Sequence, residues 1–261
     1  MKNRKTALIT GADSGIGFEL ACSLAKRGYD LILVARNRQK LDAAKQKLKK
    51  YSVSVRVLPA DLSRREECLR VYEETKPEQI AFAANNAGVG VYGSFAETDL
   101  EKELNLIDVN ITAVHMLTKL FLRDMRKRGS GVILNVASSA GFMAGPYFSS
   151  YYASKNYVVR LTQAIREELR REGSKVKIAA LCPGPVKTSF DENAGVRRSM
   201  QGMDPRIAAE YGVSEALRGR CLIVPGVGMK LGLLGSKLLG EGLLTRVTGT
   251  IQKRKGGRNG S

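Results

Sequence analysis

Short apolar runs alternate with amphipathic, helix-favouring segments along most of the chain. The runs occupy residues 5–10, 30–36, 53–63, 79–88, 131–141 and 176–184, with a seventh candidate at 219–226. The intervening segments, such as residues 15–27 and 38–51, have the length and patterning of helices. Apolar strands separated by helices are typical of a parallel sheet that is covered on both faces. We therefore expect an α/β fold with a doubly wound, Rossmann-like parallel sheet.

The 261 residues contain no internal repeat and no linker-like break before about residue 249. One domain spanning residues 1–261 is expected, with residues 249–261 as a basic, flexible tail. No run of about 18 apolar residues and no leader-like N-terminus is visible, which favours a cytoplasmic protein. The four cysteines are scattered and His115 is the single histidine, so we expect no metal site.

The net charge of +18 favours anionic partners. The basic residues are spread along the chain and are not interleaved with aromatic residues, so nucleic acid is not an expected partner. Residues 226–255 are rich in Leu, Gly and Lys. Two interpretations of this region stay open: it packs on the sheet edge or a partner subunit, or it lies on a membrane surface with the basic tail at anionic headgroups.

A glycine-rich stretch, "TGADSGIG" at residues 10–17, joins the first predicted strand to the first predicted helix. Gly11 permits a tight turn, Gly15 lets the backbone approach a phosphate, and Gly17 allows close packing of helix and sheet. A helix N-terminus placed there offers free N–H groups to a pyrophosphate. The spacing matches neither G-x-G-x-x-G nor a P-loop, so turn geometry alone is the alternative explanation.

The second predicted strand ends in "LVARN", with Arg36 where dinucleotide folds that bind NAD carry an acidic residue. An acid there would bind the adenosine ribose hydroxyls, whereas an arginine suits a 2′-phosphate. Arg36, with help from Arg38, therefore favours NADP(H) over NAD(H). The alternative is that Arg36 is a solvated surface charge.

Seven motifs occur in an order that resembles the short-chain dehydrogenase/reductase family. They are "TGADSGIG", "ADLS" with Asp61, "NNAG" at 85–88, "DVN" with Asn110, "SSAG" at 138–141, "YYASK", and "PGPVKT" at 183–188. The resemblance extends from Thr6 to about Phe190. It implies an NAD(P)-dependent oxidoreductase that interconverts a carbonyl and an alcohol and is commonly a dimer or tetramer.

The same resemblance implies cofactor contacts from the glycine-rich turn, the second strand end and the segments after the third, fourth and sixth strands. These residues are Gly11, Asp13, Ser14, Gly15, Ile16, Gly17, Arg36, Asp61, Leu62, Asn86, Ala87, Gly88, Pro183, Gly184, Val186 and Thr188, together with Tyr151 and Lys155. Asp61 would bind the adenine amine, with a turn-capping role as the alternative. Asn86 and Asn110 each have a structural alternative.

For chemistry, the resemblance assigns Ser138, Tyr151, Lys155 and Asn110 as the catalytic set. Ser138 would orient the carbonyl, Tyr151 would deliver the proton, Lys155 would lower the phenol pKa, and Asn110 would help to relay protons. Tyr152 also lies about one turn from Lys155, but the Y-x-x-x-K pattern and the step of thirteen residues from Ser138 both select Tyr151.

Apolar residues precede the tyrosine and follow the sixth strand, namely Phe142, Met143, Tyr147, Phe148 and Phe190. They favour a hydrophobic ketone or aldehyde as substrate. A non-catalytic sensor or scaffold that only binds the dinucleotide is the competing function.

Overall fold

The computed structural model describes residues 4–196, 201–236 and 240–255. Its centre is a seven-stranded sheet in the order β3-β2-β1-β4-β5-β6-β7, in which every pairing is parallel. The strands are β1 (Thr6–Thr10), β2 (Asp30–Ala35), β3 (Val55–Pro59), β4 (Phe82–Asn85), β5 (Val132–Val136), β6 (Lys177–Leu181) and β7 (Leu222–Ile223). All seven predicted strands are thus present, and the fold prediction is confirmed.

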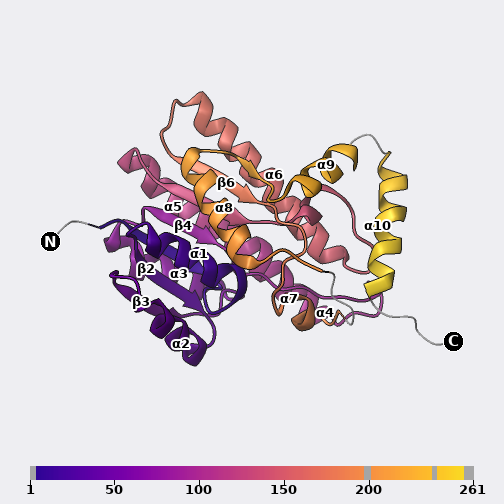
Figure 1. Ribbon diagram of the computed structural model, residues 1–261, viewed down its shortest axis with the longest axis horizontal. Helices are drawn as coiled ribbons and strands as arrows, with labels where there is room; N and C mark the ends of the chain where they lie inside the picture. Colours follow the sequence, from indigo (N-terminus) through magenta and orange to yellow (C-terminus); the bar gives the residue numbers. More distant parts are fainter. Residues whose placement is uncertain (1–3, 197–200, 237–239, 256–261) are drawn as a thin grey trace.

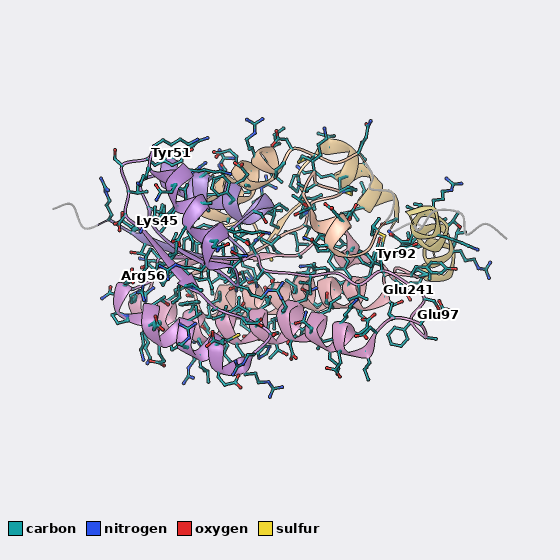
Figure 2. The ribbon with its side chains drawn as sticks, turned by 90° about the horizontal axis from the view of Figure 1, so that it is seen from below. Lys45, Tyr51, Arg56, Tyr92, Glu97 and Glu241 are labelled. Carbon is teal, nitrogen blue, oxygen red and sulfur yellow. The ribbon has the colours of Figure 1, made fainter. Side chains whose placement is uncertain are left out.

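Helices cover both faces of this sheet (Figure 1). One layer contains α1 (Gly15–Lys26), α2 (Arg38–Leu48) and α8 (Pro205–Arg218), and the other contains α3 (Arg65–Thr75), α5 (Val114–Arg128) and α6 (Ser149–Arg171). Figure 2 shows the sheet between these two helical layers. The elements α4 (Leu100–Ile107), α7 (Phe190–Asn193), α9 (Val227–Ser236) and α10 (Glu241–Lys255) lie toward one end of the molecule.

Strand β1 shows how one short apolar run serves two cores. Side chains of successive strand residues point to opposite faces, so Ala7 and Ile9 pack under the α1, α2 and α8 layer and Leu8 packs under the other layer. All three side chains are fully buried. This two-sided burial explains why the predicted strands are continuously apolar rather than alternating.

The strand order reverses between β1 and β4, which are direct neighbours in the sheet. Crossovers on opposite sides of that junction leave a crevice at the carboxyl ends of the strands, where ligands of open α/β sheets bind. The glycine-rich turn follows β1, "NNAG" ends β4, and Ser138 follows β5. The topology therefore brings the predicted site segments to one edge of the sheet.

The C-terminal region differs from its prediction. Residues 249–255, expected to begin a flexible tail, form the last turns of α10, and residues 256–261 of that expectation lie outside the described residues. Thr248 and Gln252 are each only 4% exposed, because this helix docks on the loop that precedes α6. In the described ranges no helix is both long enough and apolar enough to cross a membrane.

Candidate active site

The glycine-rich turn requires glycine at three positions. Gly11 and Gly15 have φ angles of +61° and +53°, which L side chains rarely adopt. A Cβ on Gly17 would lie 2.0 Å from the carbonyl oxygen of Gly11. Asn86 Nδ2 donates to the carbonyl oxygens of Thr10 (2.9 Å) and Gly11 (3.1 Å), so "NNAG" fastens the turn to β4. This gives Asn86 the strand-tying role that the sequence left open.

The first turn of α1 is arranged to receive an anion. Ser14 occupies the N-cap position, and its side chain makes no capping hydrogen bond to the helix. The first backbone N–H groups of a helix have no partner within it, and they lie at the positive end of the helix dipole. Thr188 lies directly over this turn, because a Cβ on Gly15 would be 3.1 Å from Thr188 Cγ2. The cradle therefore fits the pyrophosphate of a dinucleotide.

Replacing Gly17 by alanine should damage both stability and cofactor binding. The added methyl would meet backbone, which cannot move aside, so we expect a loss of about 3 kcal/mol in the free energy of unfolding. Urea unfolding and NADPH binding measure the two effects. Gly232→Ala in α9 is the matched control, because a Cβ there meets open space. Equal unfolding midpoints for the two variants would contradict the packing argument.

Arg36 and Asp61 are the two residues predicted to contact the adenosine part of the cofactor. Ala35 ends β2 and is buried, whereas Arg36 is exposed, and no ion pair or hydrogen bond within the described part of the chain involves its guanidinium. Arg38 instead pairs with Asp42 (Nε to Oδ2, 3.0 Å). Asp61 Oδ1 accepts from the backbone N–H and the hydroxyl of Ser63, which is the turn-capping role named as its alternative.

Helix α6 places the predicted acid and cation one turn apart. Tyr151 lies in its first turn, and its phenol lies beside the Ser138 side chain at the end of β5. Lys155 Nζ lies 5.7 Å from the centroid of the Tyr151 ring. The three residues predicted to act on the carbonyl therefore meet at the crevice.

Lys155 is held from the other side by backbone. Its Nζ donates to the carbonyl oxygen of Val136 (2.9 Å), and the side chain is buried. A Cβ on Gly88 would lie 3.3 Å from Asn110 Oδ1 and 3.4 Å from Lys155 Nζ. The cation thus sits beside "NNAG" and Asn110.

Asn110 belongs to a π-helical segment, Asp108–Ala113, between α4 and α5. Its Oδ1 accepts from the backbone N–H of Val89 (2.9 Å), and its Nδ2 donates to the carbonyl oxygen of Val89 (2.9 Å) and to Ser154 Oγ (3.1 Å). The side chain therefore has a structural role. Interruptions of this kind in a helix are frequent at functional sites, since they disturb the regular backbone hydrogen bonds.

Burial governs the pKa values of Tyr151 and Lys155. It raises the pKa of the Tyr151 phenol, and the hydrogen bond from Ser138 only partly opposes this. Burial also lowers the pKa of Lys155 to about 8. From the family resemblance, Lys155 is expected to lower the pKa of the Tyr151 phenol. The structure differs because Lys155 points its ammonium at the Val136 carbonyl and over the ring, so desolvation decides the pKa of Tyr151.

The Lys155 shift predicts how activity depends on pH. Carbonyl reduction consumes a proton, so kcat/KM for reduction should be level at low pH and fall about tenfold per pH unit above about pH 8, where Lys155 loses its charge. Lys155→Arg should remove this fall, because guanidinium stays charged. A wild-type profile that is flat up to about pH 10 would oppose this role.

The lowered pKa of Lys155 also makes the folding stability of the free protein depend on pH. A folded-state pKa below the ordinary lysine value of 10.5 means that the unfolded chain keeps the proton to higher pH. Folding stability from this group therefore rises as pH increases from about 8 to 10.5, and is lower below that window.

A packed cluster of apolar side chains surrounds the Tyr151 ring. Phe148 and Phe190 flank its ring, with centroids 4.7 and 5.1 Å away. Met143 and Tyr92 complete this aromatic cluster, and Gly90 lies beneath it because a Cβ there would be 2.8 Å from Phe148 Cζ. Two further predicted pocket residues differ: Phe142 packs into the core behind α6, and Tyr147 is half-buried outside the cluster, with a φ angle of +63°.

No sequence pattern predicted that two residues near this cluster, Tyr92 and Gln252, would lie together. Tyr92 and Gln252 contact each other across 160 positions, since the Tyr92 hydroxyl donates to the Gln252 carbonyl oxygen (2.8 Å). Gln252 also contacts Tyr152, the neighbour of the predicted acid. The open cleft between α1 and α8, lined by residues such as Glu19 and Arg206, contains none of the predicted site residues.

Comparisons with known proteins agree with this arrangement. A family model described as short chain dehydrogenase matches residues 5–198. An uncharacterized oxidoreductase of Staphylococcus saprophyticus is 33% identical over 216 residues, which are 81% of this chain and 92% of that protein. The very-long-chain 3-oxoacyl-CoA reductase of Anas platyrhynchos is 35% identical over 194 residues. That match covers 71% of this chain but only 61% of the reductase.

Among solved structures, a short-chain dehydrogenase from Sphingobium yanoikuyae in complex with NADPH superposes with a TM-score of 0.81. It is 30% identical, and the match covers 92% of this chain and 95% of that one. Sequence and fold therefore point to the same group of enzymes.

Proposed function

The chain belongs to the short-chain dehydrogenase family and is an NAD(P)-dependent oxidoreductase, and from this premise we propose that it reduces a hydrophobic ketone or aldehyde with NADPH. The observation that carries the proposal is the meeting of Ser138, Tyr151 and Lys155 beside an apolar, mostly aromatic cluster at the carboxyl ends of the strands.

In this proposal each residue acts at a stated atom. Ser138 Oγ donates a hydrogen bond to the substrate carbonyl oxygen and stabilises the negative charge that develops there. The nicotinamide cofactor, when bound, supplies the hydride that is added to the carbonyl carbon. Tyr151 gives its phenolic proton to the oxygen, which completes the alcohol. Lys155 stabilises the resulting phenolate, and protons reach it past Asn110 from solvent.

The raised phenol pKa suits this direction. A phenol that resists ionisation stays protonated at neutral pH and is available as the acid. Phe148 and Phe190 keep water from the reacting carbonyl, which strengthens the hydrogen bond from Ser138. Closure of these rings over Tyr151 also means that α7, which carries Phe190, has to shift when a substrate enters.

The preference for NADPH is supported by the free guanidinium of Arg36 and by the lack of an acid at the end of β2. The similar Sphingobium enzyme was crystallised with NADPH. The apolar cluster, in which Met143 packs with aromatic side chains, supports a hydrophobic carbonyl compound as the substrate. The Anas relative is named for a 3-oxoacyl substrate.

A substrate screen tests the proposal. Aliphatic, alicyclic and aromatic ketones and aldehydes are incubated with the enzyme and either NADPH or NADH, and cofactor oxidation is followed by absorbance. We expect turnover of apolar compounds with NADPH and little turnover of sugars. A sensor or scaffold would bind NADPH and oxidise it with no member of the panel.

We also propose that the protein forms a homodimer or homotetramer. The helix α4 presents Leu100, Leu104 and Ile107 at helical spacing on its outer face, and all three are exposed. An apolar stripe of this kind suits burial against a second subunit. Light scattering of the purified protein gives the oligomeric state.

A weak contact with membrane surfaces is our proposal for the C-terminal region. Six apolar side chains on α9 and α10 are between 42% and 73% exposed, so they do not pack within the chain: Val227, Leu231, Leu234, Leu243, Val247 and Ile251. Exposed cations accompany them on α10, at Arg246, Lys253 and Arg254. Apolar side chains flanked by cations suit an interface with anionic lipid.

Cosedimentation with phosphatidylglycerol vesicles at physiological salt measures this contact. We expect binding that weakens about tenfold in Val247→Glu, because an apolar side chain is lost and a repelled charge is gained. Ile207→Glu on α8 is the matched control, since Ile207 is an exposed apolar residue in another layer. No binding by the wild type, or an equal loss in both variants, contradicts the proposal.

A further inference from the structure

A buried glutamine, Gln252, helps to anchor the helix α10 beside the helix α6, which carries Tyr151. Gln252 Nε2 donates to the Tyr152 hydroxyl (2.6 Å), and the Tyr92 hydroxyl donates to the Gln252 carbonyl oxygen (2.8 Å). Both tyrosines belong to the aromatic cluster around Tyr151. Figure 2 shows Tyr92 at the end of the molecule that also carries Glu241, the first residue of α10.

Further contacts place this part of α10 against the apolar cluster and the loop before α6. Thr248 Oγ1 lies 3.6 Å from Met143 Sδ. A Cβ on Gly249 would lie 3.2 Å from Pro146 Cγ, so the helix approaches the loop before α6 closely. This loop leads to Phe148, which packs on the Tyr151 ring. The inner face of α10 is therefore continuous with the residues that surround the reacting carbonyl.

The Gln252 carboxamide is only half satisfied. The side chain is 4% exposed, and its Oε1 is buried with no hydrogen-bond partner among the described residues. A buried polar atom without a partner costs about 1–3 kcal/mol, so such atoms are rare unless a ligand or water completes them. Because Nε2 is directed at the Tyr152 hydroxyl, Oε1 is the end of the amide that has no partner among the described residues.

We propose that Gln252 is a substrate-binding residue whose Oε1 accepts a hydrogen bond from a hydroxyl or amide N–H of the substrate, remote from the carbonyl that is reduced. Tyr152 is its positioning residue, because it holds Nε2 and so directs the oxygen. An acceptor without a charge selects neutral donors and disfavours carboxylates and phosphates at that end of the substrate. This inference rests on the proposed function, since it names the substrate class of that site: hydrophobic carbonyl compounds with a distal donor.

Matched ketones test the assignment. Methyl ketones of increasing chain length are compared, each with and without a terminal hydroxyl, and kcat and KM are measured with NADPH. One neutral hydrogen bond should lower KM by about fivefold to tenfold for the hydroxylated member at the chain length that reaches Oε1, with kcat unchanged. Gln252→Leu should abolish this preference, so that the two members of a pair then have the same KM.

The conservative variant separates binding from support of the fold. Gln252→Glu keeps an acceptor oxygen and should retain the preference for the hydroxyl, while Tyr152→Phe should weaken it by releasing the carboxamide. Lys253→Gln, on the exposed side of the same helix, is the matched control and should change nothing. If the difference in KM between paired ketones survives in Gln252→Leu, or is lost to the same extent in Lys253→Gln, the proposal is overturned.

Binding gives a readout that does not depend on turnover. The same ketone pairs are titrated into Tyr151→Phe in the presence of NADPH and followed by the thermal unfolding midpoint. A preference for the hydroxylated member that disappears on adding Gln252→Leu supports the assignment even if the wild type reduces none of them. Equal stabilisation by both members at every chain length shows that Oε1 is filled by water, and the proposal then fails.

Discussion

Tyr151→Phe should lower kcat about a thousandfold while the protein stays folded and binds NADPH as before. The variant removes one oxygen, the only part of the side chain that can give a proton to the substrate, and general acid catalysis commonly contributes a factor of about 10²–10⁴. The ring itself remains between Phe148 and Phe190, so the packing of the cluster is kept. Steady-state kinetics with the best substrate of the screen, together with thermal unfolding, measure both parts.

The neighbouring tyrosine supplies the control. Tyr152 has the same side chain on the same helix and also forms a hydrogen bond, but its hydroxyl faces Gln252 rather than Ser138. Tyr152→Phe should therefore keep kcat on plain ketones within about threefold of wild type. Full activity in Tyr151→Phe, or an equal loss in both variants, would show that the acid lies elsewhere.

The loss of kcat in Tyr151→Phe does not measure the contribution of Tyr151 alone, because Ser138 and Lys155 act with it. The three side chains act on one oxygen, so their individual losses cannot be added. Ser138→Ala removes the donor to the developing charge and also the hydrogen bond that opposes the raised phenol pKa. We therefore expect its pH profile for reduction to change together with kcat, whereas Tyr151→Phe changes the rate with little remaining pH dependence.

The sheet and its two layers follow closely from the sequence because they depend on local periodicity. Continuous apolar runs are explained by strands buried on both faces, as Leu8 and Ile9 show. The start of α8 is also set locally, since Asp204 accepts from the Arg206 backbone N–H (2.8 Å) and Pro205 follows at the first helical position. Signals of this kind lie within a few residues of the structure that they specify.

The packing of α10 on the aromatic cluster could not be predicted in this way. Gln252 lies 100 positions from Tyr152, in a stretch whose basic residues indicated a solvated tail. Its burial results from tertiary contacts with the loop before α6, which no local pattern of α10 encodes. Likewise, the pKa of Tyr151 depends on the direction in which Lys155 points and on the rings around the phenol. Neither can be read from the spacing between the two residues.

Arg36→Asp should reverse the cofactor preference, changing the ratio of kcat/KM for NADPH to that for NADH by about a thousandfold. Loss of a charge-assisted contact to the 2′-phosphate costs about 1.5–3 kcal/mol, and a carboxylate adds repulsion to that phosphate. The same carboxylate can accept from both ribose hydroxyls of NADH, so activity with NADH should rise rather than merely persist.

The geometry supports this outcome. The backbone N–H of Ala12, in the glycine-rich turn, donates to the carbonyl oxygen of Val34 (3.3 Å), two residues before Arg36. The end of β2 therefore adjoins the turn that would hold the pyrophosphate, so the Arg36 side chain is close enough to meet the adenosine ribose. Arg38→Gln is the matched control, because Arg38 is already paired with Asp42, and we expect it to change the ratio less than about threefold. If Arg36→Asp leaves the ratio unchanged, Arg36 is only a surface charge and the cofactor preference is set by other residues. If it lowers activity with both cofactors equally, the end of β2 shapes the crevice without discriminating between them.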